Sequence, residues 1–280
     1  MTQVNKKGID VSVHQGTIDW DKVKAAGIEF AMIRAGYGNN NIDGQFRRNM
    51  TECNRLGIPC GVYWFSYALN ADQAAREAQQ CLAAIKPYKV EYPVCFDLEY
   101  DTVRYAKDNG ITIGKALATA FVKAFCAAVE NAGYYAMNYC NQDYSKNMLD
   151  MDALGGFDLW YAWYNDSCNR SDAGMWQYSS SGKVSGIAGP VDLDYSFKDY
   201  AAIIKGAGLN GFKKEQPPAP APQPTPPPQA KPEDDVPDWQ RQGLKKLTGK
   251  VISDPDYWKS KMKEPITVGE VLGILGKMVN

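Results

Sequence analysis

Up to residue 200 the chain alternates short apolar segments with segments of helical character, and this alternation restricts the possible folds more than any other feature. The predicted strands cover residues 7–14, 30–37, 58–67, 93–100, 134–141, 158–164, 175–179 and 191–195. The predicted helices cover residues 19–27, 43–56, 71–86 and 114–132. Strands that are apolar on both faces need cover on both faces, which a parallel sheet flanked by helices provides.

Eight predicted strands in a stretch of this length favour a closed barrel. After the strand at 134–141 the intervening segments are too short or too glycine-rich for full crossover helices, so we expect an irregular second half. In barrels of parallel strands the chemistry takes place at the carboxyl ends of the strands. Polar residues at predicted strand ends are therefore the candidates for a functional site.

Asp97 and Glu99 interrupt the apolar strand at 93–100. Side chains two positions apart on a strand point to the same side and lie roughly 6.5–7 Å apart along it. Two carboxylates so placed at the end of a buried strand repel each other and lose hydration, which raises the pKa of at least one of them. An acid beside an ionised carboxylate is suited to cleaving a glycosidic bond. The competing interpretation is a carboxylate pair that caps loop amides or binds Arg and Lys.

Three further charged residues interrupt apolar strands. Asp10 in the first strand and Asp192 in the last fall at or near strand ends, so we expect them beside Asp97 and Glu99 at one end of the barrel. Arg34, inside the second strand, needs an anionic partner, and an acid of the cleft would serve. The competing interpretation for Asp10 is a strand-end cap.

The composition argues against several function classes. A formal net charge of −1 gives no reason to expect nucleic acid as a partner. The single histidine, His14, cannot supply the two or more imidazole ligands that a zinc peptidase or amidase usually needs. We expect it at the polar rim of the barrel rather than as a catalytic base, and we expect no metal and no cofactor.

The seven cysteines are odd in number, form no C-x-x-C pair and mostly lie in apolar segments. This pattern predicts reduced, buried thiols and synthesis in a reducing compartment. Residues 1–7 lack the apolar region of a signal peptide, and no run approaches the length of a membrane span. We therefore expect a soluble protein with no export signal and no membrane insertion.

Residues 217–232 contain nine prolines in sixteen positions. This composition predicts an extended, semi-rigid spacer that reaches roughly 50 Å at about 3.1 Å per residue. The chain is thereby divided into a barrel domain at 1–212, a linker at 213–235 and a small all-α domain at 236–280.

In the small domain we predict helices at 239–247 and 267–278, with a turn region at 253–258. A unit this small rarely stabilises itself strongly. It would therefore pair with a copy of itself or dock on a target, and a passive solubilising appendage is the alternative.

Five separate motifs carry a resemblance to a known family. They are Gly8-Ile9-Asp10-Val11-Ser12-x-x-Gln15-Gly16, Phe96-Asp97-Leu98-Glu99, Trp160-Tyr161-Ala162, Met175-Trp176-Gln177-Tyr178 and Gly186-Ile187-x-Gly189-x-Val191-Asp192-Leu193-Asp194. In order and spacing they resemble glycoside hydrolase family 25, the lysozymes (N-acetylmuramidases) of phage endolysins and of fungal and bacterial autolysins. The resemblance implies an irregular (β/α)5β3 TIM-like barrel, which agrees with the α/β strand count above.

The resemblance also implies roles for the four acids. Glu99 would be the general acid that protonates the leaving glycosidic oxygen. Asp97 would orient or stabilise the N-acetyl group of the substrate. Asp10 and Asp192 would complete the acidic cleft and hold Glu99 in position. A neighbouring-group mechanism and an inverting mechanism are both compatible with this set.

Five residues are candidates for substrate binding, the aromatic ones with core packing as the alternative: Tyr63, Tyr139, Trp163, Trp176 and Arg34. The chain departs from the family pattern in two places. The third strand has Tyr63-Trp64-Phe65 where many relatives have Tyr-His-Phe, and Asp194 stands where the family often has Asn. We therefore do not count Asp194 among the catalytic residues.

The function implied by the resemblance is hydrolysis of the β-1,4 bond between N-acetylmuramic acid and N-acetylglucosamine in bacterial peptidoglycan. An endolysin of this kind stays in the host cytoplasm until a holin opens the membrane, and then lyses the wall. Residues 236–280 would bind a cell-wall polymer or mediate homo-oligomerisation. The alternatives are a barrel that binds peptidoglycan without cutting it, and a stem-peptide peptidase or amidase, which a single histidine argues against.

Overall fold

The computed structural model describes residues 5–214, 238–248, 254–261, 265 and 271. The chain separates into two compact units, Met1–Gln216 and Pro217–Asn280, and each is described by itself below. The predicted linker at 213–235 lies almost wholly outside the described residues.

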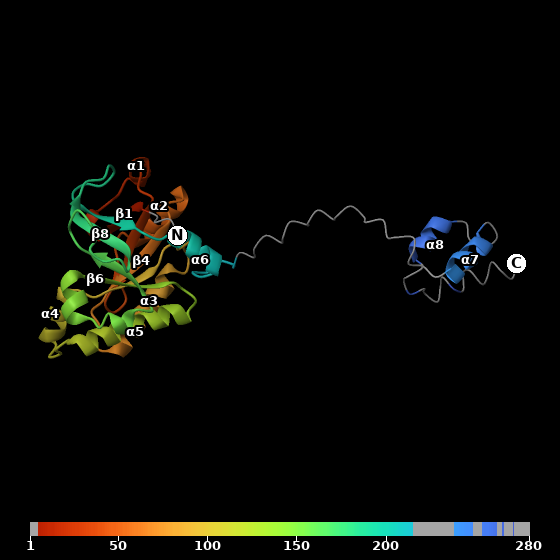
Figure 1. The fold of residues 1–280 in the computed structure, drawn as a ribbon. Helices are drawn as coiled ribbons and strands as arrows, with labels where there is room; N and C mark the ends of the chain where they lie inside the picture. Colours follow the sequence, from red (N-terminus) through yellow and green to blue (C-terminus); the bar gives the residue numbers. More distant parts are fainter. Residues whose placement is uncertain (1–4, 215–237, 249–253, 262–264, 266–270, 272–280) are drawn as a thin grey trace. The chain divides into compact units, whose positions relative to one another are not determined.

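Eight strands of the first unit close into a barrel, and a ninth, β3, pairs with the end of β2 (Figure 1). Around the barrel the order is β1-β9-β8-β7-β6-β5-β4-β2, closed by a parallel pairing of β1 with β2. The predicted barrel is therefore confirmed. The strands are β1 (Lys6–Val11), β2 (Phe30–Tyr37), β3 (Asn41–Ile42), β4 (Cys60–Phe65), β5 (Val94–Asp97), β6 (Ala136–Asn141), β7 (Asp158–Ala162), β8 (Ala173–Gly182) and β9 (Val191–Ser196).

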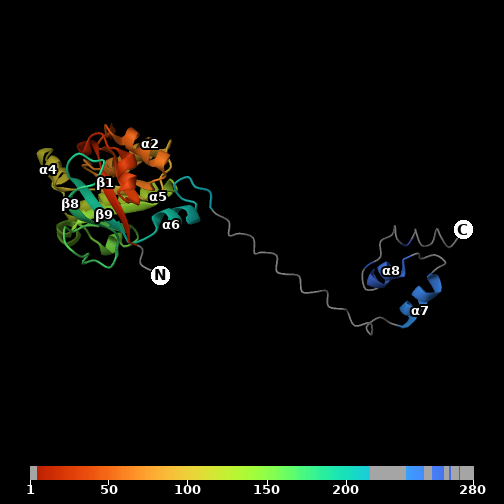
Figure 2. The same cartoon turned by 90° about the horizontal axis from the view of Figure 1, so that it is seen from above.

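Helices lie outside the barrel, with α5 packed against α3 (Figure 1). Figure 2 shows α2, α4 and α6 at the periphery of this unit, around β1, β8 and β9. After β6 the chain forms only a π-helical turn and a 3-10 turn before β7, so the expected irregular second half is confirmed. The helices are α1 (Trp20–Ala25), α2 (Phe46–Leu56), α3 (Ala71–Ile85), α4 (Tyr100–Asp108), α5 (Lys115–Asn131) and α6 (Tyr200–Ala207).

Three elements were not predicted: β3, α4 and α6. Helix α6 had readable signals, because Asp199 accepts a hydrogen bond from the backbone N–H of Ala202 at its start and Gly208 adopts a left-handed conformation at its end. Helix α4 is short and buries only Thr102 and Ala106, so its sequence lacks the long apolar face by which the other helices were predicted.

Strand β9 is the exception to the parallel arrangement, because it runs antiparallel to both β8 and β1. The connection from β8 to β9 spans only residues 183–190. A parallel return would need a crossover of a dozen or more residues, whereas a short connection permits an antiparallel hairpin. This reversal decides which end of β9 reaches the mouth of the barrel.

Side chains alternate across each strand, and this divides the apolar residues into two cores. The inner core points into the barrel and includes Phe30, Met32, Tyr63, Cys95, Met137, Tyr139, Trp160 and Met175. The outer core lies between strands and helices and includes Ile33, Val62, Trp64, Phe96, Phe125 and Tyr161. Both faces of most strands are thus buried, as their continuous apolar sequences predicted.

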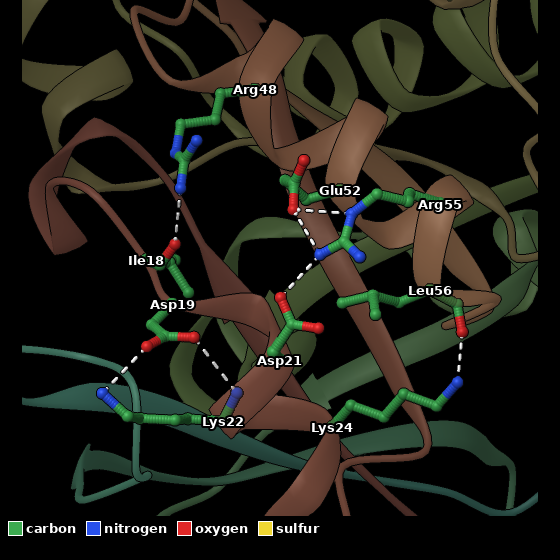
Figure 3. Close-up of polar contacts among 9 residues, drawn as sticks. All are labelled: Ile18, Asp19, Asp21, Lys22, Lys24, Arg48, Glu52, Arg55 and Leu56. Atoms are coloured by element: carbon green, nitrogen blue, oxygen red, sulfur yellow. Dashed lines mark hydrogen bonds and ion pairs between the residues drawn. The ribbon is translucent and has the colours of Figure 1, made fainter.

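Figure 3 shows polar contacts between α1 and α2 on the surface of this unit. Arg55 of α2 pairs with Asp21 of α1 at 2.6 Å and with Glu52 at 2.8 Å. Arg48 donates a hydrogen bond to the carbonyl oxygen of Ile18 at 3.0 Å. Exposed ion pairs contribute little stability, so the outer core does most to hold these helices in place.

The second unit contains two described helices that contact each other, α7 (Asp238–Leu247) and α8 (Pro255–Lys261). Helix α7 corresponds to the helix predicted at 239–247. The turn predicted at 253–258 is wrong, because α8 begins at Pro255, a residue suited to the first helical position, and Asp254 accepts a hydrogen bond from the backbone N–H of Tyr257. The helix predicted at 267–278 lies outside the described residues. No described helix of either unit has the length and apolarity to cross a membrane.

We expect Gly61→Ala to destabilise the barrel by about 1–3 kcal/mol, because a methyl group there overpacks the inner core. A Cβ at Gly61 would lie 2.6 Å from the carbonyl oxygen of Pro93 and 2.7 Å from Met32 Sδ. Gly206→Ala is the control, because a Cβ at that α6 position meets nothing within 4 Å. Urea denaturation of both variants checks this, and equal stability of Gly61→Ala and wild type would contradict it.

Candidate active site

A cavity of about 260 Å³ opens at the carboxyl ends of the parallel strands. Its walls combine acidic, amide and aromatic side chains from strands that are far apart in sequence. The residues that line it are Asp10, Ser12, His14, Gln15, Arg34, Tyr63, Phe65, Asp97, Glu99, Tyr139, Trp160, Tyr164, Gln177 and Asp192. All four acids predicted for the site are among them, and His14 lies exposed at the rim, as expected.

Asp97 and Glu99 come from different elements. Asp97 is the last residue of β5, whereas Glu99 is the N-cap residue of α4, so the prediction that both lie on one strand is wrong. The strand ends because its pairing with β4 ends at Phe65 and Asp97, after which the chain turns into the helix. Both carboxyl groups nevertheless line the same cavity, and the charge of Glu99 acts on Asp97.

Asp10 and Asp192 face each other across neighbouring strands. They are register partners in the antiparallel pair β1–β9. Asp192 lies at the amino end of its strand rather than at the predicted carboxyl end. Because β9 runs in the opposite direction to the other barrel strands, its amino end reaches the same mouth. The sequence therefore placed Asp192 at the correct end of the barrel, but it reaches that end because β9 runs antiparallel and not because it follows a parallel strand.

The four acids differ in burial. Asp10 and Asp97 are 5% and 4% exposed, and Glu99 and Asp192 are half-buried. Burial raises the pKa of Asp10 well above its usual range, and the charges of Asp194 and Asp192 raise it further. Burial raises the pKa of Asp97 in the same way, with the Glu99 charge adding and the Arg34 charge opposing.

The same causes act on the two more accessible acids. Burial raises the pKa of Glu99, and the charges of Asp101 and Asp192 add to this. Burial also raises the pKa of Asp192. Every acid of the cavity therefore holds its proton to a higher pH than it would in water, which is the property a proton donor needs.

Arg34 points into the cavity, but its partner is not one of the cleft acids as expected. Its Nε atom lies 2.9 Å from Oδ2 of Asp43, which is fully buried in the turn after β3. The same carboxylate accepts hydrogen bonds from the backbone N–H groups of Val13 and Gln45. Asp43 therefore neutralises Arg34 and ties it to the loop after β1, while the cleft acids keep their protons.

Aromatic residues form the floor of the cavity. The ring of Trp160 meets Tyr63 and Tyr139 edge to face, at centroid distances of 5.9 and 5.0 Å. Tyr63 and Tyr139 thus lie where the sequence placed them. Trp160 was quoted only as part of a motif, and its inward direction follows from strand alternation in β7.

Trp163 and Trp176 do not line this cavity. Trp176 and Gln177 are neighbours on β8, so their side chains point to opposite faces, and Trp176 packs in the outer core against Tyr178 and Tyr195. Trp163 packs against the same core, and its carbonyl oxygen accepts a hydrogen bond from Nε1 of Trp176 at 2.7 Å.

Gln177 was missed as a site residue, although it lies at the centre of the polar contacts. Its Nε2 atom donates to Oδ2 of Asp10 at 2.7 Å. Its Oε1 atom accepts from the hydroxyl groups of Tyr139 and Tyr164, at 3.0 and 3.1 Å. Gln177 therefore holds Asp10 and two aromatic rings together. The alternation of side chains along β8, which points Gln177 into the barrel, was the signal that could have identified it.

A second set of hydrogen bonds holds the backbone of Glu99 in place. The backbone N–H of Glu99 donates to Oγ1 of Thr102, which in turn donates to the carbonyl oxygen of Ser66 at 2.7 Å. The hydroxyl group of Ser66 donates to Oε2 of Glu77 at 2.6 Å. Burial raises the pKa of Glu77 to about 7. Residues of β4, α3 and α4 thus fix the backbone that carries Glu99.

The described residues contain no group of three or more His, Cys, Asp or Glu side chains that could hold a metal ion. The seven thiols are unpaired; six are buried and Cys168 is half-buried.

Comparisons with known proteins identify relatives of the barrel. The chain is 28% identical over 192 residues to an autolytic lysozyme of Clostridium acetobutylicum, covering 67% of this chain and 55% of that protein. It is 28% identical over 205 residues to lysozyme M1 of Streptomyces globisporus, covering 66% of each. The chain thus spans between about half and two thirds of the length of these curated relatives.

Solved structures agree on the fold. The autolysin LytC of Streptococcus pneumoniae, solved with a synthetic peptidoglycan ligand, superposes with a TM-score of 0.62 at 30% identity, covering 68% of this chain and 46% of that one. The endolysin CTP1L shares the fold, with a TM-score of 0.61 at 24% identity, over 72% of this chain and 70% of that one. The family model described as "Glycosyl hydrolases family 25" matches residues 9–187, well over half of the chain. The chain therefore belongs to glycosyl hydrolases family 25.

Proposed function

We propose that the protein is a lysozyme that hydrolyses the β-1,4 bond between N-acetylmuramic acid and N-acetylglucosamine in bacterial peptidoglycan. The observation that carries the proposal is the convergence of Asp10, Asp97, Glu99 and Asp192 in one cavity, where each has a raised pKa. Relatives named lysozyme, and the peptidoglycan ligand of LytC, support the choice of substrate.

In this proposal Glu99 is the general acid. It is half-buried, lines the cavity and holds its proton to a raised pH, so it can protonate the leaving oxygen of a bound sugar. Asp97 is more deeply buried, and its Oδ1 atom has no hydrogen-bond partner among the described residues. A bound N–H group, such as that of an N-acetyl substituent, would satisfy this oxygen, which supports a role for Asp97 in orienting the acetamido group.

Asp10 and Asp192 complete the acidic surface. Whichever of them is ionised stabilises the positive charge that develops on the sugar ring as the bond breaks. Tyr63, Tyr139 and Trp160 form an apolar floor on which a sugar ring can lie, and the Arg34–Asp43 pair closes one side. Trp163 and Trp176 act only indirectly, through the packing of β7 and β8.

A barrel that binds peptidoglycan without cutting it is the second candidate. The four acids argue against it, because a binding site has no need to keep several carboxyl groups partly buried at the same mouth. A turbidity assay on purified walls decides between the two, because a barrel that only binds leaves the walls uncut. Analysis of the released fragments separates a muramidase from a peptidase or amidase: a muramidase leaves new reducing ends on N-acetylmuramic acid and no new free amines, whereas each amide bond that a peptidase or amidase cuts leaves one free amine and one carboxylate.

We further propose that the protein is a phage endolysin that crosses the host membrane through a holin. Support comes from the unpaired thiols, which suit a reducing compartment, and from the fold it shares with endolysin CTP1L. Expression in a susceptible host with and without a holin tests this. Lysis that depends on the holin supports it, and lysis without one contradicts it.

Residues 236–280 are proposed to bind a cell-wall polymer, with homo-oligomerisation as the alternative. The support is the composition of residues 217–232, because proline-rich sequences typically serve as spacers between binding units. Linked units raise the affinity for a polymeric surface without any new contact in the catalytic cavity.

Glu99→Gln is expected to abolish wall lysis while the protein still folds, because the amide keeps the shape of the side chain and has no proton to donate. Turbidity clearing of purified walls, with circular dichroism as the folding check, measures this. Glu130→Gln, an exposed acid on α5, is the matched control and should lyse like wild type. Lysis by Glu99→Gln would remove Glu99 from its role.

Truncation after Gln216 is expected to weaken binding to intact walls by about tenfold or more, because the second contact is lost. Cleavage of short soluble glycan fragments should be unchanged, since the barrel keeps all its strands. Pelleting assays and fragment kinetics measure the two properties, and light scattering of both forms reports whether the tail joins copies. Equal wall binding, and the same number of copies per particle in both forms, would leave the tail with neither role.

A further inference from the structure

One buried acid of the barrel is not used in the chemistry above. Asp194 is fully buried on β9, two residues after Asp192, so both carboxyl groups point into the barrel. None of the ion pairs of the described residues includes it. A carboxyl group in this position needs an explanation, because burying an unpaired charge costs several kcal/mol.

The two oxygens of Asp194 have different surroundings. Oδ1 accepts a hydrogen bond from Nε1 of Trp160 at 2.8 Å. Oδ2 is buried and has no donor among the described residues. An ionised carboxylate would leave this oxygen unsatisfied, whereas a protonated one makes it a donor. The geometry therefore favours a neutral Asp194 with its proton on Oδ2.

Asp10 is the acceptor available to that proton. It lies on the adjacent strand β1, two positions after Gly8, the register partner of Asp194, so both side chains point into the barrel, and the charge of Asp194 acts on Asp10. Two neighbouring buried carboxyl groups cannot both ionise easily, so they titrate as one unit that keeps a shared proton. From its other side Asp10 accepts the hydrogen bond of Gln177.

We propose that Asp194 is a positioning residue of the active site, which fixes the Trp160 floor through one oxygen and shares a proton with Asp10 through the other. The proposal rests on the proposed function, because it assigns a role within the same cavity. Trp160 in turn contacts Tyr63 and Tyr139, so a single carboxyl group orders three rings and one catalytic acid.

The charges around Asp194 are consistent with a shared proton. The groups that face it are Asp10 on β1, Asp192 on β9 and the Trp160 N–H on β7. Burial raises the pKa of Asp194 to about 8, the Asp192 charge adds to this, and the hydrogen bonds from Trp160 and with Asp10 oppose it. The paired carboxyl groups therefore hold at least one proton at neutral pH.

Asp194→Asn and Asp194→Leu separate the two roles. Asn offers Trp160 an oxygen but cannot ionise, whereas Leu offers neither an oxygen nor a proton. We expect KM for glycan fragments to stay near the wild-type value in Asp194→Asn and to rise in Asp194→Leu, with kcat less affected. Equal KM in all three proteins, or equal losses in both variants, would overturn the role in positioning the floor.

The pH profile tests the shared proton. Wild-type kcat/KM should show an ionisation near pH 8, where Asp194 loses its proton. Asp194→Asn should lack this ionisation. A variant profile that keeps it would overturn proton sharing.

A thermal measurement gives a readout that needs no activity. The pKa of Asp194 is about 8 in the folded protein, against an ordinary value of 3.8, so the native state binds a proton that the unfolded chain has lost between these pH values. Wild-type Tm should therefore fall relative to that of Asp194→Asn as pH rises from about 4 to about 8. Above that range the difference should be constant.

Gly206→Ala is the control, because it exchanges two residues that do not ionise at an exposed position of α6 where a Cβ meets nothing within 4 Å. Its substitution should change Tm by the same amount at every pH. A pH-independent difference for Asp194→Asn as well would overturn proton sharing. If wild type cleaved no glycan, the proposed function would fail, and the thermal comparison alone would decide whether Asp194 shares a proton.

Discussion

The active site depends on the burial of several carboxyl groups at the mouth of one barrel. Burial disfavours the charged form of each group, and neighbouring acids add to the effect. The structure limits the penalty with a small number of neutral donors, chiefly the amide of Gln177 and the indole N–H of Trp160. Arg34 is kept from neutralising the cluster, because buried Asp43 already pairs with it. The acids therefore keep their protons to a higher pH than exposed acids would.

Strand parity and strand direction place these groups. Side chains alternate between the inside and the outside of the barrel along each strand, and this alternation continues up to the mouth. No long loop is needed to bring together the inward-pointing side chains of Asp10, Tyr63, Asp97, Tyr139 and Gln177. Strand β9 contributes from its amino end because it runs antiparallel. The short connection after β8 therefore has a functional consequence: it brings Asp192 opposite Asp10.

The barrel and its four acids could be predicted from the sequence because both depend on patterns of neighbouring residues. Apolar runs at helical and strand spacing identify the elements, and an acid within such a run is conspicuous. The prediction of site residues failed where it depended on the direction in which a side chain points. Trp163 and Trp176 were assigned to the cleft from residue type alone, whereas parity on β8 places Gln177 inside and Trp176 outside. The partner of Arg34 was missed because Asp43 approaches from a turn whose path no local pattern shows.

The hydrogen bonds that hold the site in place come from two sides, one set from the outer core and one from the inner core. Glu99 sits at a helix end, where the backbone is held from the outer side by Thr102, Ser66 and Glu77. Asp10 is held from the inner side by Gln177 and its contact with Asp194. The proton donor of the proposed function has to be accessible to the substrate, so it is fixed through its backbone. A buried acid can be fixed through its side chain, and its charge then depends on its neighbours. The different burial of Glu99 and Asp10 is therefore the physical basis for the different roles that we propose for them.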